Sequence, residues 1–214
     1  MENEVINAKA EKGSALLQKV YDFVLNGVPM MSEPLSELVA PYITHNENKE
    51  AAIEKFILNQ KLKCAGTGFV TGLGGILTLP VTIPADLVSS LYIEQRMIAA
   101  IAMIRGYDVH DDQVKTLVYM CLIGNAIGDV IKQVGIQAVE KIAVKKLLPK
   151  LTQEIIVKIN KAVGFRLLAK GGSKSPIILL KTIPALGGIV GGTYNWIEVA
   201  VYAKYAKKMF NENK

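Results

Sequence analysis

A charge-free stretch of 22 residues, Cys64 to Ala85, constrains this chain more than any other part of its sequence. A stretch this long reaches the roughly 20 apolar residues that a membrane-spanning helix needs. However, it holds five glycines and two prolines, and a proline inside a helix removes a backbone donor and clashes with the preceding turn. We therefore expect a helix that breaks near residues 72–75, a buried or re-entrant turn, and a new helix that begins at Pro84.

Apolar residues recur at helical spacing through most of the remaining chain, and no stretch shows the sustained alternation of a β-strand. We expect helices over residues 3–25, 49–65, 84–105, 111–148 and 152–169. The predicted apolar face of the second of these helices comprises Ala52, Ile53, Phe56, Ile57 and Leu62. The fold class that follows is all-α, a multi-helix bundle with apolar hairpins broken by glycine and proline.

Three prolines between Val28 and Asn48 mark the clearest boundary in the chain. We expect residues 1–48 to form an N-terminal helix and a proline-rich connection, with at most one short helix around residues 35–39. Residues 49–214 form the main helical domain. Within it, the sequence Thr-Ile-Pro-Ala at 82–85 recurs at 182–185, which chance or a weak internal pseudo-repeat would explain.

The composition favours a cytoplasmic protein with an affinity for membranes. Half of the residues are hydrophobic, 21% are charged, and the mean hydropathy is +0.29, which is apolar for a soluble protein and too polar for a multi-span membrane protein. Cys64 and Cys121 lie in apolar surroundings, so we expect two reduced core thiols. A disulfide or a metal pair is the alternative, although no CxxC motif supports it.

Positive charge is concentrated between residues 130 and 181. This stretch contains eleven Lys or Arg residues and two acidic residues, Glu140 and Glu154, which gives a net charge of +9. Such a block favours phosphates on lipid headgroups or nucleic acid. Nucleic-acid binding is disfavoured because Phe165 is the single aromatic residue in the block. An amphipathic cationic helix on an anionic membrane and a solvated face of a soluble bundle both stay open. The expected anionic-lipid contacts are Lys141, Lys145, Lys146 and Lys150.

No catalytic constellation is recognisable: the chain lacks GxSxG, HExxH and CxxC motifs, and we expect no metal site and no cofactor. Asp86, Ser90 and Glu94 follow one another at four-residue spacing, which places them on one stripe of an apolar helix, with Arg96 on the neighbouring one. These four residues are the candidate polar site. A charge network that fixes helix packing, a polar patch in a ligand cavity and catalysis are the three interpretations.

The glycines and prolines of the two apolar segments are the other candidate functional residues. Glycines four apart let helix backbones approach closely, in soluble bundles as in membranes. Tight packing is one interpretation, and a hairpin that moves into or along a bilayer is the other. The residues concerned are Gly68, Gly72, Gly74, Gly75, Pro80 and Pro84 in the first segment and Pro184, Gly187, Gly188, Gly191 and Gly192 in the second.

The stretch from Thr67 to Asp86 reads TGFVTGLGGILTLPVTIPAD and resembles the signature of the EcsC family. The continuation through Arg96 to Gly106-Tyr107-Asp108 is similar to that family too, as is the C-terminal Ile183-Pro184 with its glycines. The likeness covers roughly residues 50–210. It implies a bacterial protein linked to an ABC transporter system, for which a hydrolase activity has been suggested, and it carries over no catalytic residues.

From these features we predict a peripheral, amphitropic protein at the inner face of the cell membrane that binds lipid or another apolar ligand. Its expected partner is an anionic membrane surface or lipid, with a membrane transporter as a second candidate. The alternatives are a transporter-associated hydrolase of unknown substrate and a non-catalytic interaction scaffold. The sequence leaves the oligomeric state open.

Overall fold

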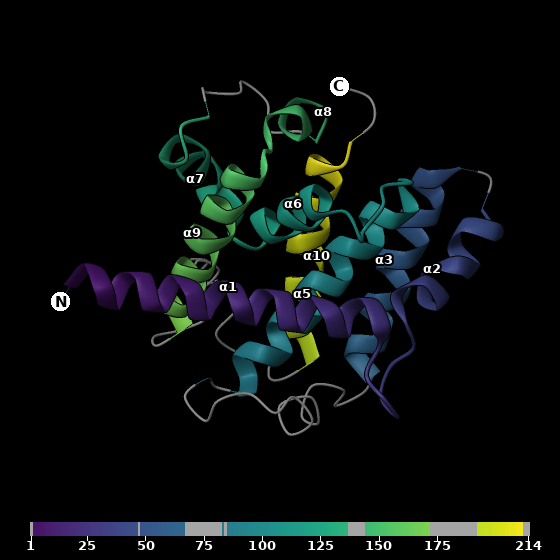
Figure 1. Cartoon of the computed structure of the whole chain (residues 1–214). Helices are drawn as coiled ribbons and strands as arrows, with labels where there is room; N and C mark the ends of the chain where they lie inside the picture. The colour runs from purple at the N-terminus through teal and green to yellow at the C-terminus, as the bar shows by residue number, and fades with distance from the viewer. Residues whose placement is uncertain are drawn as a thin grey trace, which may run out of the picture.

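The structure, a computed structural model, describes residues 2–46, 48–66, 83, 85–136, 144–171 and 192–211. Within them all regular secondary structure is helical (Figure 1), which confirms the predicted all-α bundle. The α-helices are α1 Glu2–Asn26, α2 Leu35–Thr44, α3 Lys49–Gly66, α5 Ala85–Ile104, α6 Asp112–Leu122, α7 Ile127–Gln133, α8 Val144–Leu147, α9 Gln153–Gly171 and α10 Gly192–Met209, with 3-10 turns η1 Gly124–Ala126 and η2 Leu148–Lys150.

Helix α5 lies at the centre of the bundle and contacts α1, α2, α3, α6 and α10. Helix α1 runs across the bundle in Figure 1 and makes its most extensive contact with α9, while α10 packs against both α3 and α5. The N-terminal helix shares this core, because Leu17, Val20, Tyr21 and Val24 of α1 are completely buried.

Helix α5 contains a long apolar stretch. Its stretch Leu87–Ile104 has a mean hydropathy of 1.4, and it is the one helical stretch among the described residues that is long and apolar enough to cross a membrane. However, 72% of this stretch is buried inside the protein. Residues 98–102 are fully buried against the surrounding helices, so α5 is the core helix of the bundle.

The ends of α5 and α6 follow from local chemistry. Gly106 has φ of +90°, a conformation that glycine adopts without strain. The backbone N–H of Tyr107 donates to the Ala102 carbonyl at 3.1 Å, and this arrangement ends α5. Asp111 caps α6, because its Oδ1 accepts from the backbone N–H groups of Gln113 at 2.7 Å and Val114 at 3.2 Å.

Three details of the expected secondary structure are wrong. The predicted helix over 111–148 is interrupted after α6, where Gly124 has φ of +53° and starts a 3-10 turn. Helix α2 is longer than predicted and continues through Pro41. Leu62 is not on the buried face of α3 but is 63% exposed, because at about 100° per residue it lies roughly opposite Ile53 on the helix.

Candidate functional site

Four helix ends lie at one end of the bundle. Figure 1 shows the C-terminal ends of α3 and α9 and the N-terminal ends of α5 and α10 on its lower side, beneath α1. The chain between α3 and α5 and the chain between α9 and α10 carry the two glycine- and proline-rich segments. Both segments therefore leave from and return to the same end, which we call the anchor end and define by Gly66, Ala85, Gly171 and Gly192.

The candidate glycines and prolines fall mostly outside the described residues. Gly192 is the first residue of α10. The others lie beyond the described ranges: Gly68, Gly72, Gly74, Gly75, Pro80, Pro84, Pro184, Gly187, Gly188 and Gly191.

Exposed apolar side chains accompany the anchor end. Leu58 and Leu62 are 56% and 63% exposed and stand one turn apart on α3, the helix that leads into the first apolar segment. The connection between α1 and α2 reaches the same side in Figure 1, and it carries the fully exposed Met30. Apolar groups thus reach solvent from the second half of α3, which leads to this end, and from the α1–α2 connection.

The structure describes the predicted polar stripe only in part. Glu94 is 2% exposed and engaged in a contact inside the core, whereas Ser90 is half-buried. The side chain of Asp86 lies outside the described residues. Arg96, on the same helix, pairs with Glu33 of the α1–α2 connection at 3.5 Å.

Arg96 belongs to a network that ties the α1–α2 turn to the core. Its Nη1 donates to the Tyr92 hydroxyl at 3.1 Å, and its Nη2 donates to the Glu33 carbonyl at 2.8 Å. The Tyr92 hydroxyl also lies 2.6 Å from the Ser32 Oγ. The arrangement is a packing network, because its polar atoms face one another and the Arg96 side chain is only 11% exposed. Glu33 and Ser32 were not identified from the sequence, since they lie more than sixty residues from Arg96.

The basic residues lie at the other end of the bundle. Lys145, Lys146 and Lys150 are exposed on α8 and η2, which Figure 1 shows on the upper side. The 19 residues of α9 follow directly and end at the anchor end, a separation of roughly 28 Å. Lys141, the fourth predicted lipid contact, lies outside the described residues.

Several cations of the positive block are neutralised by carboxylates on the surface. Lys158 pairs with Glu154 at 2.5 Å within α9, and Lys161 pairs with Glu11 of α1 at 3.3 Å. The Arg166 guanidinium lies 3.7 Å from the carboxylate of Asp129. The exposed positive surface is therefore smaller than the net charge of the block indicates.

Two buried tyrosines and one thiol mark the centre of the core. The rings of Tyr21 and Tyr119 meet edge to face with centroids 5.6 Å apart. Burial raises the pKa of both phenols well above the ordinary value, and it raises the pKa of the Cys121 thiol in the same way. Cys121 is thus an inert core thiol, as predicted, while the side chain of Cys64 lies outside the described residues.

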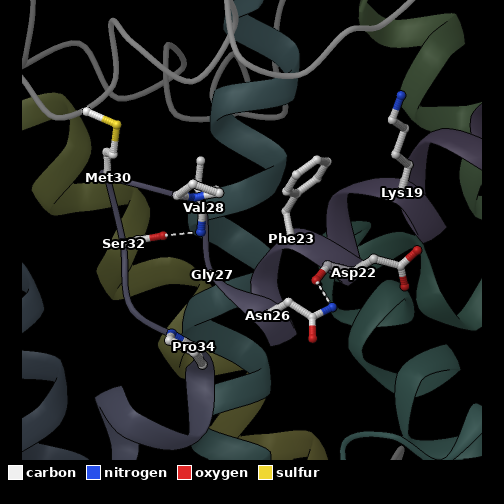
Figure 2. A pocket seen from close by; sticks show the side chains of 10 residues that line it. Lys19, Asp22, Phe23, Asn26, Gly27, Val28, Met30, Ser32 and Pro34 are labelled. Atoms are coloured by element: carbon white, nitrogen blue, oxygen red, sulfur yellow. Dashed lines mark hydrogen bonds between the residues drawn. The ribbon is translucent and has the colours of Figure 1, made fainter.

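One surface groove lies beside the α1–α2 connection and another beside α2. The first, of about 660 Å³, lies between the last turns of α1 and the following turn, with Phe23, Val28 and Met30 on its walls; Figure 2 shows these side chains. The second, of about 520 Å³, is polar and includes Glu37 and His45. Glu94 and His110 line neither groove.

The two histidines and the candidate metal ligands bear on whether the chain could carry hydrolytic chemistry. Both histidines are exposed: His45 bonds the Pro41 carbonyl through Nδ1 at 2.9 Å, and His110 precedes α6. Within the described ranges, no group of three His, Cys, Asp or Glu side chains is placed to hold a metal ion.

Comparison with known proteins gives one finding of kinship. The model of the EcsC protein family matches residues 44–212, which includes α3 to α10 and both apolar segments. No curated protein and no solved structure matches the chain.

Proposed function

We propose that this chain, which belongs to the EcsC protein family, is an amphitropic protein that associates with the inner face of the cell membrane through its anchor end. One observation carries the proposal: the helix ends that hold both glycine- and proline-rich segments converge at a single end of the bundle. Two apolar segments far apart in sequence can therefore meet one membrane together.

The exposed leucines of α3 support the same orientation. Leu58 and Leu62 leave more than half of their side-chain surface in water, and each would gain about 1 kcal/mol or more on entering hydrocarbon. Since α3 continues directly into the charge-free segment, the leucines extend its apolar surface along the helix. The two leucines are not part of the packed core.

The lysines of α8 and η2 need a separate role. They lie about 28 Å from the anchor end along α9, so a bilayer that meets the anchor end face on does not reach them. The proposal assigns hydrocarbon contact to the anchor end. Binding of anionic lipid through Lys145, Lys146 and Lys150 would be a second, distinct mode, and experiment separates the two.

Flotation with lipid vesicles tests the proposal. We expect the wild-type protein to float with neutral phosphatidylcholine vesicles and with vesicles that contain phosphatidylglycerol. The double variant Leu58→Gln, Leu62→Gln should bind about thirtyfold more weakly, because two apolar contacts of about 1 kcal/mol each are lost. Val157→Gln, which removes a half-exposed valine of α9, is the matched control and should bind as the wild type does.

The triple variant Lys145→Glu, Lys146→Glu, Lys150→Glu distinguishes the two surfaces. If the anchor end carries the contact, the variant still floats with neutral vesicles. Binding that requires anionic lipid and disappears in the triple variant would overturn the proposed orientation. A wild-type protein that stays with the soluble fraction at low salt with every lipid would overturn membrane association itself.

A further inference from the structure

Met30 is an apolar side chain held entirely in water. It is 105% exposed, and within the described residues it is the one residue other than glycine with a positive φ, at 63°. Such a backbone conformation costs a residue with a side chain about 1 kcal/mol or more. The six residues Gly27 to Ser32 around it carry no charge. Neither the exposure of the Met30 side chain nor the strain of its backbone stabilises the folded core. Both are therefore consistent with a contact that Met30 makes outside the protein.

The turn that presents Met30 is rigid. The backbone N–H of Ser32 donates to the Val28 carbonyl at 2.9 Å, and the Val28 N–H donates to the Ser32 carbonyl at 3.0 Å. The Ser32 hydroxyl contacts the Tyr92 hydroxyl, which accepts from Arg96. A turn tied in this way to the core helix α5 keeps Met30 extended instead of letting it fold back onto the surface.

The turn faces the side on which the apolar segments are anchored. Figure 1 shows the connection between α1 and α2 reaching the lower side of the bundle, where α3 ends and α5 begins. Figure 2 shows the side chains of Met30, Val28 and Phe23 extending in one direction from the groove between the turn and α1, with Lys19 beside them. An apolar tip with a neighbouring ammonium group matches the hydrocarbon and the phosphates of a bilayer.

We propose that the turn Gly27–Ser32 is a preformed membrane-insertion tip and that Met30 enters the hydrocarbon layer beside the anchor end. This inference rests on the proposed function, because it needs the anchor end to face the membrane. The turn lies outside residues 44–212, which match the family model, so the tip is a property of this chain's N-terminal segment.

A fluorescent probe at residue 30 tests the insertion. In a Cys64→Ser background, Met30→Cys labelled with an environment-sensitive dye should shift to the blue and gain intensity on neutral phosphatidylcholine vesicles. Lipids brominated along the acyl chain should then quench the dye. The same dye at Lys150→Cys, an exposed position on η2, which follows α8 directly, should stay in its aqueous state. A Met30 probe that stays aqueous while the protein floats would overturn the tip and leave the proposed function intact.

Substitutions separate insertion from folding. Met30→Asp should weaken vesicle partitioning about tenfold, and Met30→Leu should keep it. Met30→Gly should also weaken partitioning but leave the thermal midpoint unchanged or raise it, because glycine tolerates the positive φ. Partitioning that is the same in all three variants would contradict the tip. Loss of flotation by the wild type would remove the tip and the proposed function together.

Discussion

Gly13 of α1 and Gly164 of α9 face each other where the two helices meet, and neither position has space for a side chain. A Cβ atom on Gly13 would lie 2.2 Å from the Gly164 carbonyl oxygen, and a Cβ atom on Gly164 would lie 2.4 Å from the Ser14 nitrogen. Because these obstacles are backbone atoms, no change of rotamer relieves the clash. The two glycines therefore set the distance between α1 and α9.

Alanine at either position should destabilise the fold. We expect Gly13→Ala and Gly164→Ala each to lower the free energy of unfolding by about 1–3 kcal/mol, because the helices must move apart. The double variant should lose less than the combined effect of the single ones, since one displacement serves both side chains. Urea denaturation followed by circular dichroism measures all three.

Gly128 of α7 is the matched control. A Cβ atom there would meet nothing within 4 Å, so Gly128→Ala should be neutral or stabilise the protein by up to about 1 kcal/mol. Equal effects at Gly13 and Gly128 would show that helix propensity, not the crossing of α1 and α9, decides the outcome.

The two core tyrosines should respond in opposite ways to loss of the hydroxyl. The Tyr21 hydroxyl donates to the Val109 carbonyl at 2.9 Å, so Tyr21→Phe should cost about 1–2 kcal/mol. The buried Tyr119 hydroxyl has no hydrogen-bond partner among the described residues, and Tyr119→Phe should be neutral or stabilising. Thermal unfolding of both variants decides the matter, and a Tyr119→Phe protein that is as destabilised as Tyr21→Phe contradicts the described core.

Glu50 should make stability depend on pH. The hydrogen bond from Lys207, at 2.6 Å, and then the one from Arg105 lower the pKa of this carboxyl below its usual 4.5. The folded state thus favours the charged form. The resulting stability is present above pH 4.5 and is lost as the pH falls through the folded-state pKa.

Glu50→Gln should therefore lower the thermal midpoint at pH 7. The free energy of unfolding should fall by no more than about 1 kcal/mol, because the carboxyl is half exposed. The difference from wild type should shrink as the pH falls toward 3. Glu154→Gln, in the more exposed pair with Lys158, should have a smaller effect. A difference for Glu50→Gln that grows in acid would contradict the assigned pKa direction.

The N-terminal helix should be required for folding of the matched domain. A chain of residues 44–214 begins where the family match begins, but it lacks the completely buried Leu17, Val20, Tyr21 and Val24 of α1. Their loss would expose α5 and α9 to water. We expect this fragment to show no cooperative thermal transition by circular dichroism. A cooperative transition would instead support a domain boundary near residue 48.

Local sequence chemistry predicted the helices better than it predicted their partners. The spacing of apolar residues and the start at Pro84 gave α5 to within a residue at each end, and the predicted start at residue 111 lies one residue before α6. These features depend on a few neighbouring residues. Leu62 was misplaced because its apolar character was taken as burial, although helix geometry turns it away from Ile53.

The relationships that define the candidate site involve residues far apart in the chain. Gly13 and Gly164 are separated by most of the sequence, and one sequence does not say which helices cross at glycine. In the same way, Arg96 was expected to pair with a carboxylate, but its partner Glu33 follows from how the α1–α2 turn packs on α5. The distance between the lysines and the anchor end follows from the fold, in which α9 separates α8 and η2 from that end.

The orientation of the bundle on the membrane is measured most directly with one dye at its two ends. In the Cys64→Ser background, the probe is attached to Leu62→Cys near the anchor end or to Lys150→Cys on η2, both exposed positions. With neutral phosphatidylcholine vesicles, the emission at residue 62 should shift to the blue and be quenched by brominated acyl chains, while the emission at residue 150 stays aqueous. The reverse pattern, or an aqueous probe at residue 62 on protein that floats with the vesicles, would contradict the anchor end as the membrane-binding surface.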